Sequence, residues 1–560
     1  MNTCTPATRV YRPGTERALG LLGGGLPLLA LALFFVYPLL SIGWRSFTVD
    51  GAGGPTLANY LRLWSEPGIA RAAWHSLTMS GTVTVLALAA GLLLAMLFKR
   101  SRVRGRRLMF AVLMLPMLAP SLMQGLGLLF LLGRNGLVHR WTGLDTDIYG
   151  FWGLVAANAI YALPQATLII AAALERTDHR HYDAALTMGA SPWRQFLDIT
   201  LAQSRYGLLA AVFVVFSVTI TDFGNAIVLG GPYRVLANEV YDQVAGQMDI
   251  NMGAAVGMLL LLPALASLLV ERSALRRAGT GSEHARPADV RPGRGRDLGL
   301  GLGSVVVLAP VLAVFATVVY ASLVKLWPYR LELTLAHYHT DLPDGYTPIF
   351  TSLKLALLTA LAGTVLVFAL TLLVRRARPS LARGLHVMAT LPAAVPGLVI
   401  GIAYLMSFNT GPLADMLYGS LFLMAACNLY HYHAQSYLML ATGMRAVPGA
   451  LEDAVTCLGG GLLRRLRDVV LPFTAPTVAS VFFFLFMQSM VTLSAVVFLV
   501  TPELNLASVA VMQLDANGFV SQAAAYATCI VASVAAAALA MRVCATLLAR
   551  HFQRRTPDVA

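Results

Sequence analysis

Residues 182–204 read YDAALTMGASPWRQFLDITLAQS, and residues 452–474 read EDAVTCLGGGLLRRLRDVVLPFT. The two stretches align without gaps, with Tyr182 opposite Glu452, and share one spacing of acidic, small and apolar residues. Both stretches are polar, although each lies between two long apolar runs. Because a lone surface loop has no reason to occur twice with one spacing, the pattern predicts a chain built from two related halves.

The composition is that of an integral membrane protein. The 560 residues are 57% hydrophobic and only 12% charged, with a mean hydropathy of +0.69. A soluble domain is usually about 25% charged. Most apolar runs are long enough to cross a hydrocarbon core of about 30 Å as helices. They lack the period-2 alternation of a membrane β-barrel. We therefore expect an all-α integral membrane fold.

About twelve transmembrane helices are predicted from the apolar runs. The expected spans are 19–43, 76–98, 108–132, 151–174, 206–229, 253–270, 299–323, 352–374, 385–407, 418–441, 477–500 and 522–541.

The loops between these spans differ in charge on alternate sides. One set of loops, together with both termini, holds 32 of the 41 Lys and Arg residues. Because cytoplasmic loops carry an excess of Lys and Arg, we expect a multi-pass protein of the bacterial inner (plasma) membrane, with both termini and both polar stretches in the cytoplasm. The net charge of +14 arises in these loops and does not indicate a nucleic-acid partner.

A stretch rich in Arg, Gly and Pro, RRAGTGSEHARPADVRPGRGRD, cannot build a core and is predicted to link two six-helix repeats. The repeats match elsewhere, at LPMLAPSLMQG (115–125) and LPAAVPGLVIG (391–401), and at LANY (57–60) and LAHY (335–338). An even number of spans per half makes the repeats parallel. The expected units are a cytoplasmic N-terminus 1–18, a first repeat 19–270 with polar loop 175–205, a linker 271–298, a second repeat 299–541 with polar loop 442–476, and a cytoplasmic tail 542–560.

Each polar stretch is expected to form two short helices joined at a flexible corner. Gly189 and Gly459 permit backbone angles that bulkier residues avoid. The acid near the start of each first helix suits the helix dipole, and Pro472 is expected to stop or redirect the chain before the next span. One copy alone would fit an amphipathic helix lying on the membrane. Two matched copies favour a pair of docking elements.

This spacing resembles the EAA motif of ABC-importer permeases: EAA, three residues, Gly, nine residues, then I-x-LP. The first copy has Asp183 for Glu and Ala202 for Pro, and the second has Asp453 for Glu and Val455 for the second Ala. The resemblance covers both halves and implies the type I ABC-importer permease fold, with each motif a coupling helix that docks on a cytoplasmic ABC ATPase dimer. It implies a coupling role for Asp183, Ala184, Ala185, Gly189, Ile199, Leu201, Glu452, Asp453, Ala454, Gly459, Val469, Leu471 and Pro472.

The resemblance also implies partners and a solute. ATP and Mg would bind to the ATPase and no cofactor to this chain, while a periplasmic solute-binding protein would deliver the small-molecule substrate. The chain looks like the fused, double-length permeases of 2-aminoethylphosphonate, ferric-iron and polyamine importers, with thiamine as a further alternative. Residues 221–257 and 493–518 look most like the 2-aminoethylphosphonate branch, so this phosphonate is the expected solute.

Catalytic motifs are missing from the sequence. It has no GxxxxGK[ST] phosphate loop, no HExxH and no GxSxG, so we expect a transporter subunit whose ATP is hydrolysed by another chain. An ion-coupled secondary transporter is the alternative, but mid-span acids are nearly absent. The pairs His337/His339 and His431/His433 are not expected to hold a metal, because closed sites need three or four ligands.

Polar residues of the fifth span in each half are predicted to line the translocation path, since polar groups inside a membrane are usually functional. Asp222 is the only acid among them, and the alternative is that it caps a helix at the outer membrane edge. Two proline pairs, Pro116/Pro120 and Pro392/Pro396, are expected to break their helices. The predicted path residues are Ser217, Thr221, Asp222, Asn225, Gln488, Thr492 and Ser494.

Overall fold

The computed structural model describes residues 24–49, 54–144, 146–277, 293–339 and 345–553, so the predictions for residues 1–18 and for the end of the tail lie outside the described residues. In the list below, η marks a 3₁₀ or π turn. The first half contains η1 Ala32–Val36, α2 Tyr37–Ser46, α3 Ala58–Ser65, α4 Pro67–Arg100, α5 Arg106–Met114, η2 Leu115–Leu118, α6 Ser121–Leu132, α7 Leu137–Thr142, α8 Phe151–Glu175, α9 Arg180–Thr187, α10 Pro192–Gln195, η3 Phe196–Leu201, α11 Ala202–Ile220, α12 Gly224–Leu229, α13 Leu236–Tyr241, η4 Asp242–Gly246 and α14 Ile250–Arg277.

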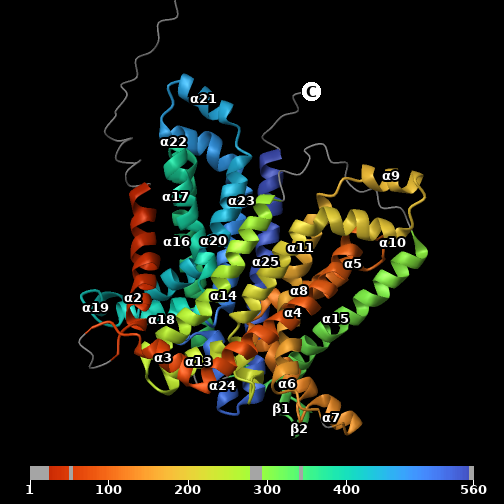
Figure 1. The fold of residues 1–560 in the computed structure, drawn as a ribbon, viewed down its shortest axis with the longest axis vertical. Coiled ribbons are helices and arrows are strands. Elements are labelled where there is room, and N and C mark those ends of the chain that lie inside the picture. The colour runs from red at the N-terminus through yellow and green to blue at the C-terminus, as the bar shows by residue number, and fades with distance from the viewer. Residues whose placement is uncertain (1–23, 50–53, 145, 278–292, 340–344, 554–560) are drawn as a thin grey trace, which may run out of the picture.

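The second half follows a similar order, but it adds a small hairpin, it has a 3₁₀ turn where the first half has α3, and it has turns at 494–499 where the first half has α12 (Figure 1). It contains α15 Arg294–Ser322, β1 Val324–Leu326, β2 Arg330–Leu333, η5 Ala336–Tyr338, α16 Thr347–Arg376, α17 Pro379–Thr390, η6 Leu391–Ala394, α18 Gly397–Phe408, α19 Ala414–Leu417, α20 Leu421–Arg445, α21 Gly449–Cys457, α22 Leu462–Arg465, η7 Leu466–Val470, α23 Leu471–Val491, α24 Ala507–Ala516 and α25 Val520–Gln553. Strands β1 and β2 pair antiparallel.

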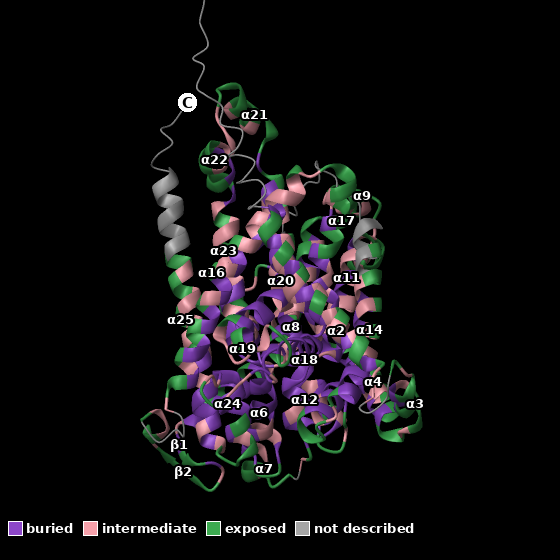
Figure 2. Ribbon diagram, turned by 90° about the vertical axis from the view of Figure 1, so that its left-hand side faces the viewer, coloured by how far each residue is buried: buried purple, intermediate pink, exposed green. Residues whose placement is uncertain are grey.

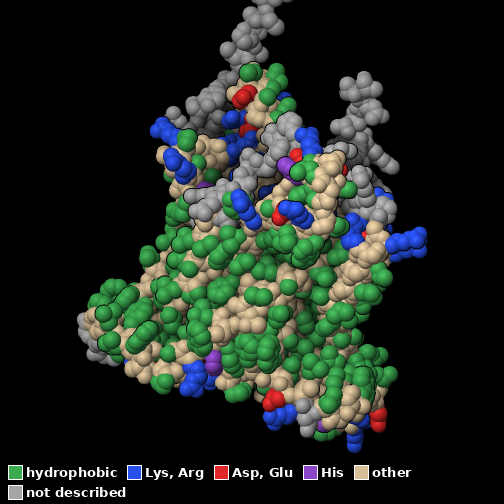
Figure 3. Space-filling model, turned by 45° about the vertical axis from the view of Figure 1, so that its right-hand side comes forward, with side chains coloured by type: hydrophobic (Ala, Val, Ile, Leu, Met, Phe, Trp, Pro, Cys, Tyr) green, Lys and Arg blue, Asp and Glu red, His purple; other side chains and the backbone are tan. Residues whose placement is uncertain are grey.

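The all-α membrane fold with two repeats is confirmed. Among the described residues, ten helices are long and apolar enough to cross a membrane, and a bent pair of helices raises the number to eleven. The remaining predicted span, 418–441, corresponds to α20, whose His, Asn and Gln residues make it less apolar than the others. Figure 3 shows an apolar band of surface between two ends where the charged side chains gather.

The proline pairs break their helices in both halves, as predicted. A 3₁₀ turn at Leu115–Leu118 separates α5 from α6, and a matching turn at Leu391–Ala394 separates α17 from α18. The segments Pro379–Ala394 and Gly397–Phe408 meet at 103°. The cause is local, because Pro lacks the N–H that a continuous helix needs and disfavours helical angles in the residue before it.

Several predicted boundaries were wrong. The span 206–229 ends at Ile220, where a break precedes α12, and the span 477–500 ends at Val491. Helices α14 and α15 extend into both ends of the predicted linker 271–298, and α25 continues through much of the predicted tail 542–560. These helices run past the apolar stretch because charged residues favour a helix about as well as leucine does, which hydropathy does not register.

The two halves interlock through their first helices. Helix α2 of the first half packs on α18 of the second half, and α15 of the second half packs on α6 of the first. The Tyr404 hydroxyl donates to the Phe34 carbonyl at 2.5 Å. Helices α6 and α15 approach so closely that a Cβ on Gly127 would lie 2.7 Å from the carbonyl oxygen of Val314. Glycine at this position therefore permits the contact.

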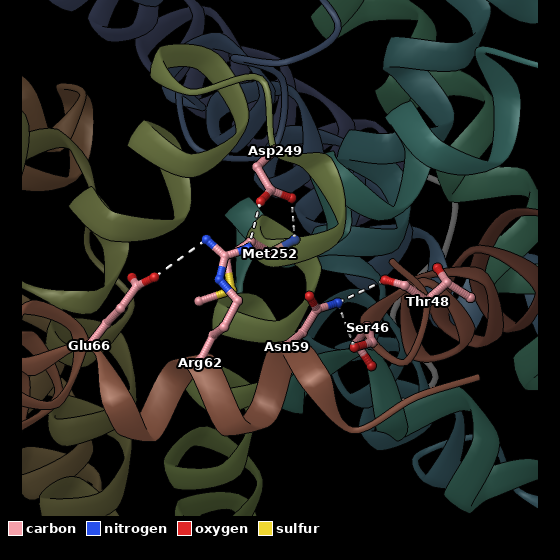
Figure 4. Close-up of polar contacts among 7 residues, drawn as sticks. All are labelled: Ser46, Thr48, Asn59, Arg62, Glu66, Asp249 and Met252. Atoms are coloured by element: carbon pink, nitrogen blue, oxygen red, sulfur yellow. Dashed lines mark hydrogen bonds and ion pairs between the residues drawn. The ribbon is translucent and has the colours of Figure 1, made fainter. Parts of the chain in front are cut away.

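The LANY and LAHY repeats perform the same structural task. The Tyr60 hydroxyl bonds the Ser46 hydroxyl at 2.8 Å at the end of α2, and Tyr338 bonds Ser322 at 2.6 Å at the end of α15. The side-chain amide of Asn59 donates to the carbonyls of Ser46 and Thr48, at 3.2 and 2.8 Å (Figure 4). In the same view Arg62 bridges Glu66 and Asp249, which ties the short helix α3 to the start of α14.

Candidate translocation cavity and duplicated segments

The duplicated segments project from one end of the molecule. Helices α9 and α10 in the first half, and α21 and α22 in the second, lie at the end opposite to α7, α24 and the hairpin (Figure 1). None of these four helices contains a buried residue, and Figure 2 shows α9 and α21 as mostly exposed. The two segments are therefore surface features of the described chain.

The glycine at each corner has the predicted backbone conformation. Gly189 has φ +73° and Gly459 has φ +75°, in the left-handed region that L side chains rarely adopt. An added Cβ would meet nothing within 4 Å at either position. The left-handed angle, and not lack of space, is the reason for glycine here.

Large apolar side chains surround these corners at matched positions. Met188 is 85% exposed and Leu458 is 81% exposed, while Trp193 and Leu463 are 68% and 63% exposed. The members of each pair stand opposite each other when the two stretches are aligned. Contiguous exposed apolar side chains on a polar segment are typical of an interaction site.

The second helix of each segment differs from the prediction. Instead of a separate short helix, it is the first part of a long continuous one, Pro192–Ile220 in the first half and Leu462–Val491 in the second. Each long helix contains a π turn at the same place, Phe196–Leu201 and Leu466–Val470. Pro472 does not stop the chain, because it lies in the first turn of α23, directly after the π turn has shifted the hydrogen-bond pattern.

The residues with a predicted coupling role differ in exposure. Ala184, Gly189, Asp453, Ala454, Gly459, Leu471 and Pro472 are exposed, Asp183, Ala185, Ile199, Leu201 and Glu452 are half-buried, and Val469 is buried.

An arginine holds each segment to the end of a neighbouring span. In the first half, Arg100 at the end of α4 donates to the Leu174 carbonyl and to the Thr177 hydroxyl, and its guanidinium lies 4.9 Å from the centre of the Tyr182 ring. This cation–π contact joins α4 to α9.

Arg375 at the end of α16 makes the equivalent contacts in the second half. It donates to the carbonyls of Met444 and Val447, which are the counterparts of Leu174 and Thr177 when the alignment of the polar stretches is extended. In place of the ring it has the carboxylate of Glu452, at 2.6 Å. Sequence reasoning missed both arginines, because Lys and Arg at a span end were taken only as evidence of orientation.

A cavity of about 350 Å³ lies between the two halves. Both proline turns, the fourth span of each half (α8 and α20) and the ends of α11 and α23 line it. Many lining residues are counterparts in the same alignment, including Gln165/Gln435, Tyr161/His431 and Asp222/Thr492. The cavity wall therefore follows the internal repeat.

Six of the seven predicted path residues line this cavity: Ser217, Thr221, Asp222, Gln488, Thr492 and Ser494. Asn225 does not line it. It is buried in α12, and its backbone N–H donates to Asp222 Oδ2 at 3.0 Å. Asp222 therefore does cap a helix, as the alternative proposed, yet it also lines the cavity. The counterpart of Asp222 in the second half is Thr492, whose hydroxyl hydrogen-bonds the Tyr432 hydroxyl at 2.8 Å.

Sequence reasoning overlooked the fourth span. Tyr161 and Gln165 of α8, and His431, Tyr432 and Gln435 of α20, also line the cavity. The signal was present, because the alignment of the polar stretches pairs Gln165 with Gln435. Extending that alignment to every span would have found them.

The two HxH pairs have different environments. His337 Nε2 bonds the carbonyl of Val324 at 2.9 Å, in the place that Asn59 holds in the first half. His431 lines the cavity, and the ring nitrogens of its neighbour His433 are buried without a hydrogen bond. Within the described residues no group of three or more His, Cys, Asp or Glu side chains is arranged to hold a metal ion.

Comparison with known proteins identifies the family. The family described as "Binding-protein-dependent transport system inner membrane component" matches residues 84–277. The molybdenum transport system permease protein ModB of Azotobacter vinelandii is 31% identical over 176 residues, covering 30% of this chain and 78% of that protein. This chain belongs to the family of ABC-importer permeases. It is a multi-pass membrane permease.

Other relatives of this permease match over both halves. The ferric transport system permease protein FbpB of Actinobacillus pleuropneumoniae is 27% identical over 545 residues, covering 91% of this chain and 76% of that protein. The thiamine transport system permease protein ThiP of Brucella abortus is 26% identical over 422 residues, covering 72% of this chain and 73% of that protein. The permease is thus a double-length member of the family.

Proposed function

We propose that this permease forms the pore of an importer driven by a separate cytoplasmic ABC ATPase dimer and supplied by a periplasmic solute-binding protein. The observation that carries the proposal is the pair of exposed apolar corners around Gly189 and Gly459. They lie at one end of the molecule, have one backbone geometry and carry large side chains that are mostly exposed. Two equal docking elements suit a partner with two equal grooves. In this proposal that end faces the cytoplasm.

The continuous helices give the docking elements a mechanical connection to the cavity. Pro192–Ile220 has 29 residues, which corresponds to about 43 Å of helix. It runs from the α10 end of the docking element to Ser217 in the cavity wall, and Leu462–Val491 likewise runs to Gln488. Movement of either docking element would therefore change the shape of the cavity.

ATP and Mg bind to the ATPase in this proposal, and the permease supplies no residue for hydrolysis. Closure of the ATPase dimer would draw the two segments together and favour the outward-facing state, and hydrolysis would restore the inward-facing one. Nucleotide then acts by shifting a population between two states, with the arginine contacts of Arg100 and Arg375 holding each segment to its half.

The cavity chemistry supports a small zwitterion as the solute, and we place 2-aminoethylphosphonate first. Asp222 is the one carboxylate that the described part of the chain places in the wall, and it suits an ammonium group. Hydroxyl, amide and imidazole groups around it, among them Tyr161 and Gln435, suit phosphonate oxygens. The likeness of residues 221–257 and 493–518 to the phosphonate branch supports the same choice.

Ferric iron is the second candidate. It is favoured by the FbpB relatives, which match over both halves of the chain. Thiamine is named for a relative that covers 72% of the chain, and polyamines were also expected from the sequence. An ion-coupled secondary transporter is not proposed, because the family match and the paired docking elements support the importer.

The first experiment tests the ATPase partnership. Purification from the native host should recover an ABC ATPase with the permease, and Gly189→Asp or Gly459→Asp should abolish its recovery. Both positions have room for a side chain, and aspartate tolerates a left-handed angle better than most residues, so loss of the partner would report on the docking surface. Gly518→Asp is the matched control, because Gly518 has φ +81° and open space and follows α24, which lies at the opposite end (Figure 1). Uptake in a strain without any ATPase subunit would refute the proposal.

The second experiment tests the solute. In proteoliposomes with the ATPase and binding protein, ATP-dependent uptake of 2-aminoethylphosphonate, ferric iron, thiamine and putrescine is compared. Asp222→Asn should lower uptake of the aminophosphonate by about tenfold or more while nucleotide-dependent ATPase activity remains, because it removes one charge-assisted contact. Transport of ferric iron alone would replace the first candidate by the second and leave the importer proposal intact.

A further inference from the structure

A second hollow of about 980 Å³ lies on the flank of the first half. Residues at the end of α4, along one face of α5 and in the last part of α8 line it, together with Arg542 of α25. It does not share a lining residue with the translocation cavity, and neither the importer proposal nor the docking elements make use of it. We refer to it as the flank groove.

One part of the flank groove is strongly basic. Lys99, Arg106, Arg107 and Arg542 contribute four positive charges, and Glu175 contributes one negative charge, which leaves a formal +3. Lys99 forms an ion pair with Glu175. Arg106 and Arg107 are exposed, and within the described chain neither has a carboxylate at ion-pair distance.

The start of α5 adds hydrogen-bond donors to this basic part. The helix begins at Arg106, after Gly105, and no side chain caps its N-terminus. The first amide groups of a helix lack internal acceptors and carry the positive end of the helix dipole, so they favour an anion. Two arginines and a free helix start therefore converge on one place.

The other part of the flank groove is apolar. Phe98 and Phe110 meet edge to face, with ring centres 5.5 Å apart, and Met114 and Leu168 extend the wall. Phe110 is 42% exposed and Leu168 is 38% exposed, so both side chains are open to the hydrocarbon of the membrane. From Arg106 to Met114 helix α5 runs about 12 Å, which approaches one leaflet of hydrocarbon of about 15 Å.

The second half does not reproduce this groove. By the proline spacing, Arg106 corresponds to Ala382 and Phe110 corresponds to His386, whose ring bonds the Tyr437 hydroxyl at 2.9 Å. Arg107 and Lys99 keep basic counterparts, Arg383 and Arg375, so the basic side is shared in part. The second arginine and the Phe110 ring are what distinguish the first half.

We propose that the flank groove binds one anionic phospholipid, with its phosphate at Arg106, Arg107 and the start of α5, and an acyl chain along Phe98, Phe110 and Met114. Basic pockets beside transmembrane helices suit acidic headgroups. The apolar wall favours a lipid over a free phosphate ion, because only a lipid joins an anionic headgroup to an acyl chain that can follow the wall away from the arginines. The site is independent of which solute is transported.

The test uses the full-length permease, delipidated in detergent and examined by native mass spectrometry after adding phosphatidylglycerol, phosphatidylcholine or inorganic phosphate. One phosphatidylglycerol should bind with at least roughly tenfold preference over phosphatidylcholine. Inorganic phosphate at the same concentration should not displace it. Displacement by phosphate, or equal binding of the two lipids, would overturn the proposal.

Variants locate the site. Arg106→Ala with Arg107→Ala should lower phosphatidylglycerol binding about tenfold or more, and Arg464→Ala with Arg467→Ala is the matched control, since it removes two exposed arginines of the second half. Phe110→Ser should weaken binding of long-chain phosphatidylglycerol more than that of a short-chain analogue. Size-exclusion chromatography checks that each variant is folded. Wild-type affinity in the Arg106/Arg107 double variant would refute the site.

Discussion

The two duplicated segments are held by one geometry and by different chemistry. Each duplicated segment follows a span, α8 or α20. Arg100 and Arg375 both donate to a carbonyl near the end of that span, at Leu174 and Met444. The third contact then differs, because Arg100 lies over the ring of Tyr182 whereas Arg375 meets the carboxylate of Glu452. By the proline spacing Arg375 is the counterpart of Lys99, one residue before Arg100. The two halves thus keep an arginine contact at the end of the span, while both its exact position and its chemical nature change.

The difference should affect how firmly each segment is held. The Arg375–Glu452 pair is shielded, with 25% and 14% of the side chains exposed, and a shielded charged hydrogen bond contributes more than an exposed one. A cation–π contact at a partly exposed site contributes about 0.5–1 kcal/mol. We therefore expect the segment of the second half to open less often than that of the first.

The largest expected effect comes from Glu452→Gln. It retains the shape of the side chain and leaves the guanidinium of Arg375 without its counter-charge, at a cost of about 2 kcal/mol. Limited trypsin cleavage within segment 442–476 should accelerate roughly 30-fold, since cleavage follows the population of the opened segment. The control is Glu332→Gln, which removes an exposed pair with Lys325 at the hairpin. An unchanged cleavage rate would show that the ion pair does not hold the segment.

A smaller effect is expected from the ring of Tyr182. Tyr182→Phe removes only the hydroxyl bond to Thr200, at 2.8 Å, whereas Tyr182→Leu removes the ring as well. The Leu variant should be cleaved within segment 175–205 about fivefold faster than the Phe variant, which corresponds to about 1 kcal/mol for the ring. Equal cleavage of the two variants would mean that the ring over Arg100 adds no stability.

The smallest effect, and an equal one in both halves, is expected for the corner glycines. Gly189→Ala and Gly459→Ala each force a side chain into a left-handed angle, and the strain of about 1–2 kcal/mol is partly offset by lower entropy of the unfolded chain, about 0.4–1 kcal/mol. Each segment should be cleaved about threefold faster. Gly43→Ala, in open space within α2, should show no acceleration. Clearly different cleavage rates for the two variants would show that the two corners differ in stability despite their equal backbone angles.

Local chemistry allowed much of this molecule to be predicted from sequence. The proline turns, the left-handed glycines and the six polar cavity residues of the fifth spans depend on residues near each other in the chain, and the repeat made these features visible twice. The contacts of Arg100 and Arg375 could not be predicted in this way, since they join positions that are far apart in the chain. The π turns were also missed, because Phe196–Leu201 and Leu466–Val470 have no composition that distinguishes them from an ordinary helix.

The first helix of each half packs on the other half, so the order of synthesis decides when each of these contacts can form. The contacts between the first helix and α18 join residues 370 positions apart. At roughly 5–20 residues per second, a ribosome needs about 20–75 s to make that length. During this time the first helix is in the membrane without α18, whereas α15 emerges after its partner α6 is already in place. The first described helix can thus pack on α14 early, but its contact with α18 must wait, so the insertion machinery or surrounding lipid must shelter its α18-facing side.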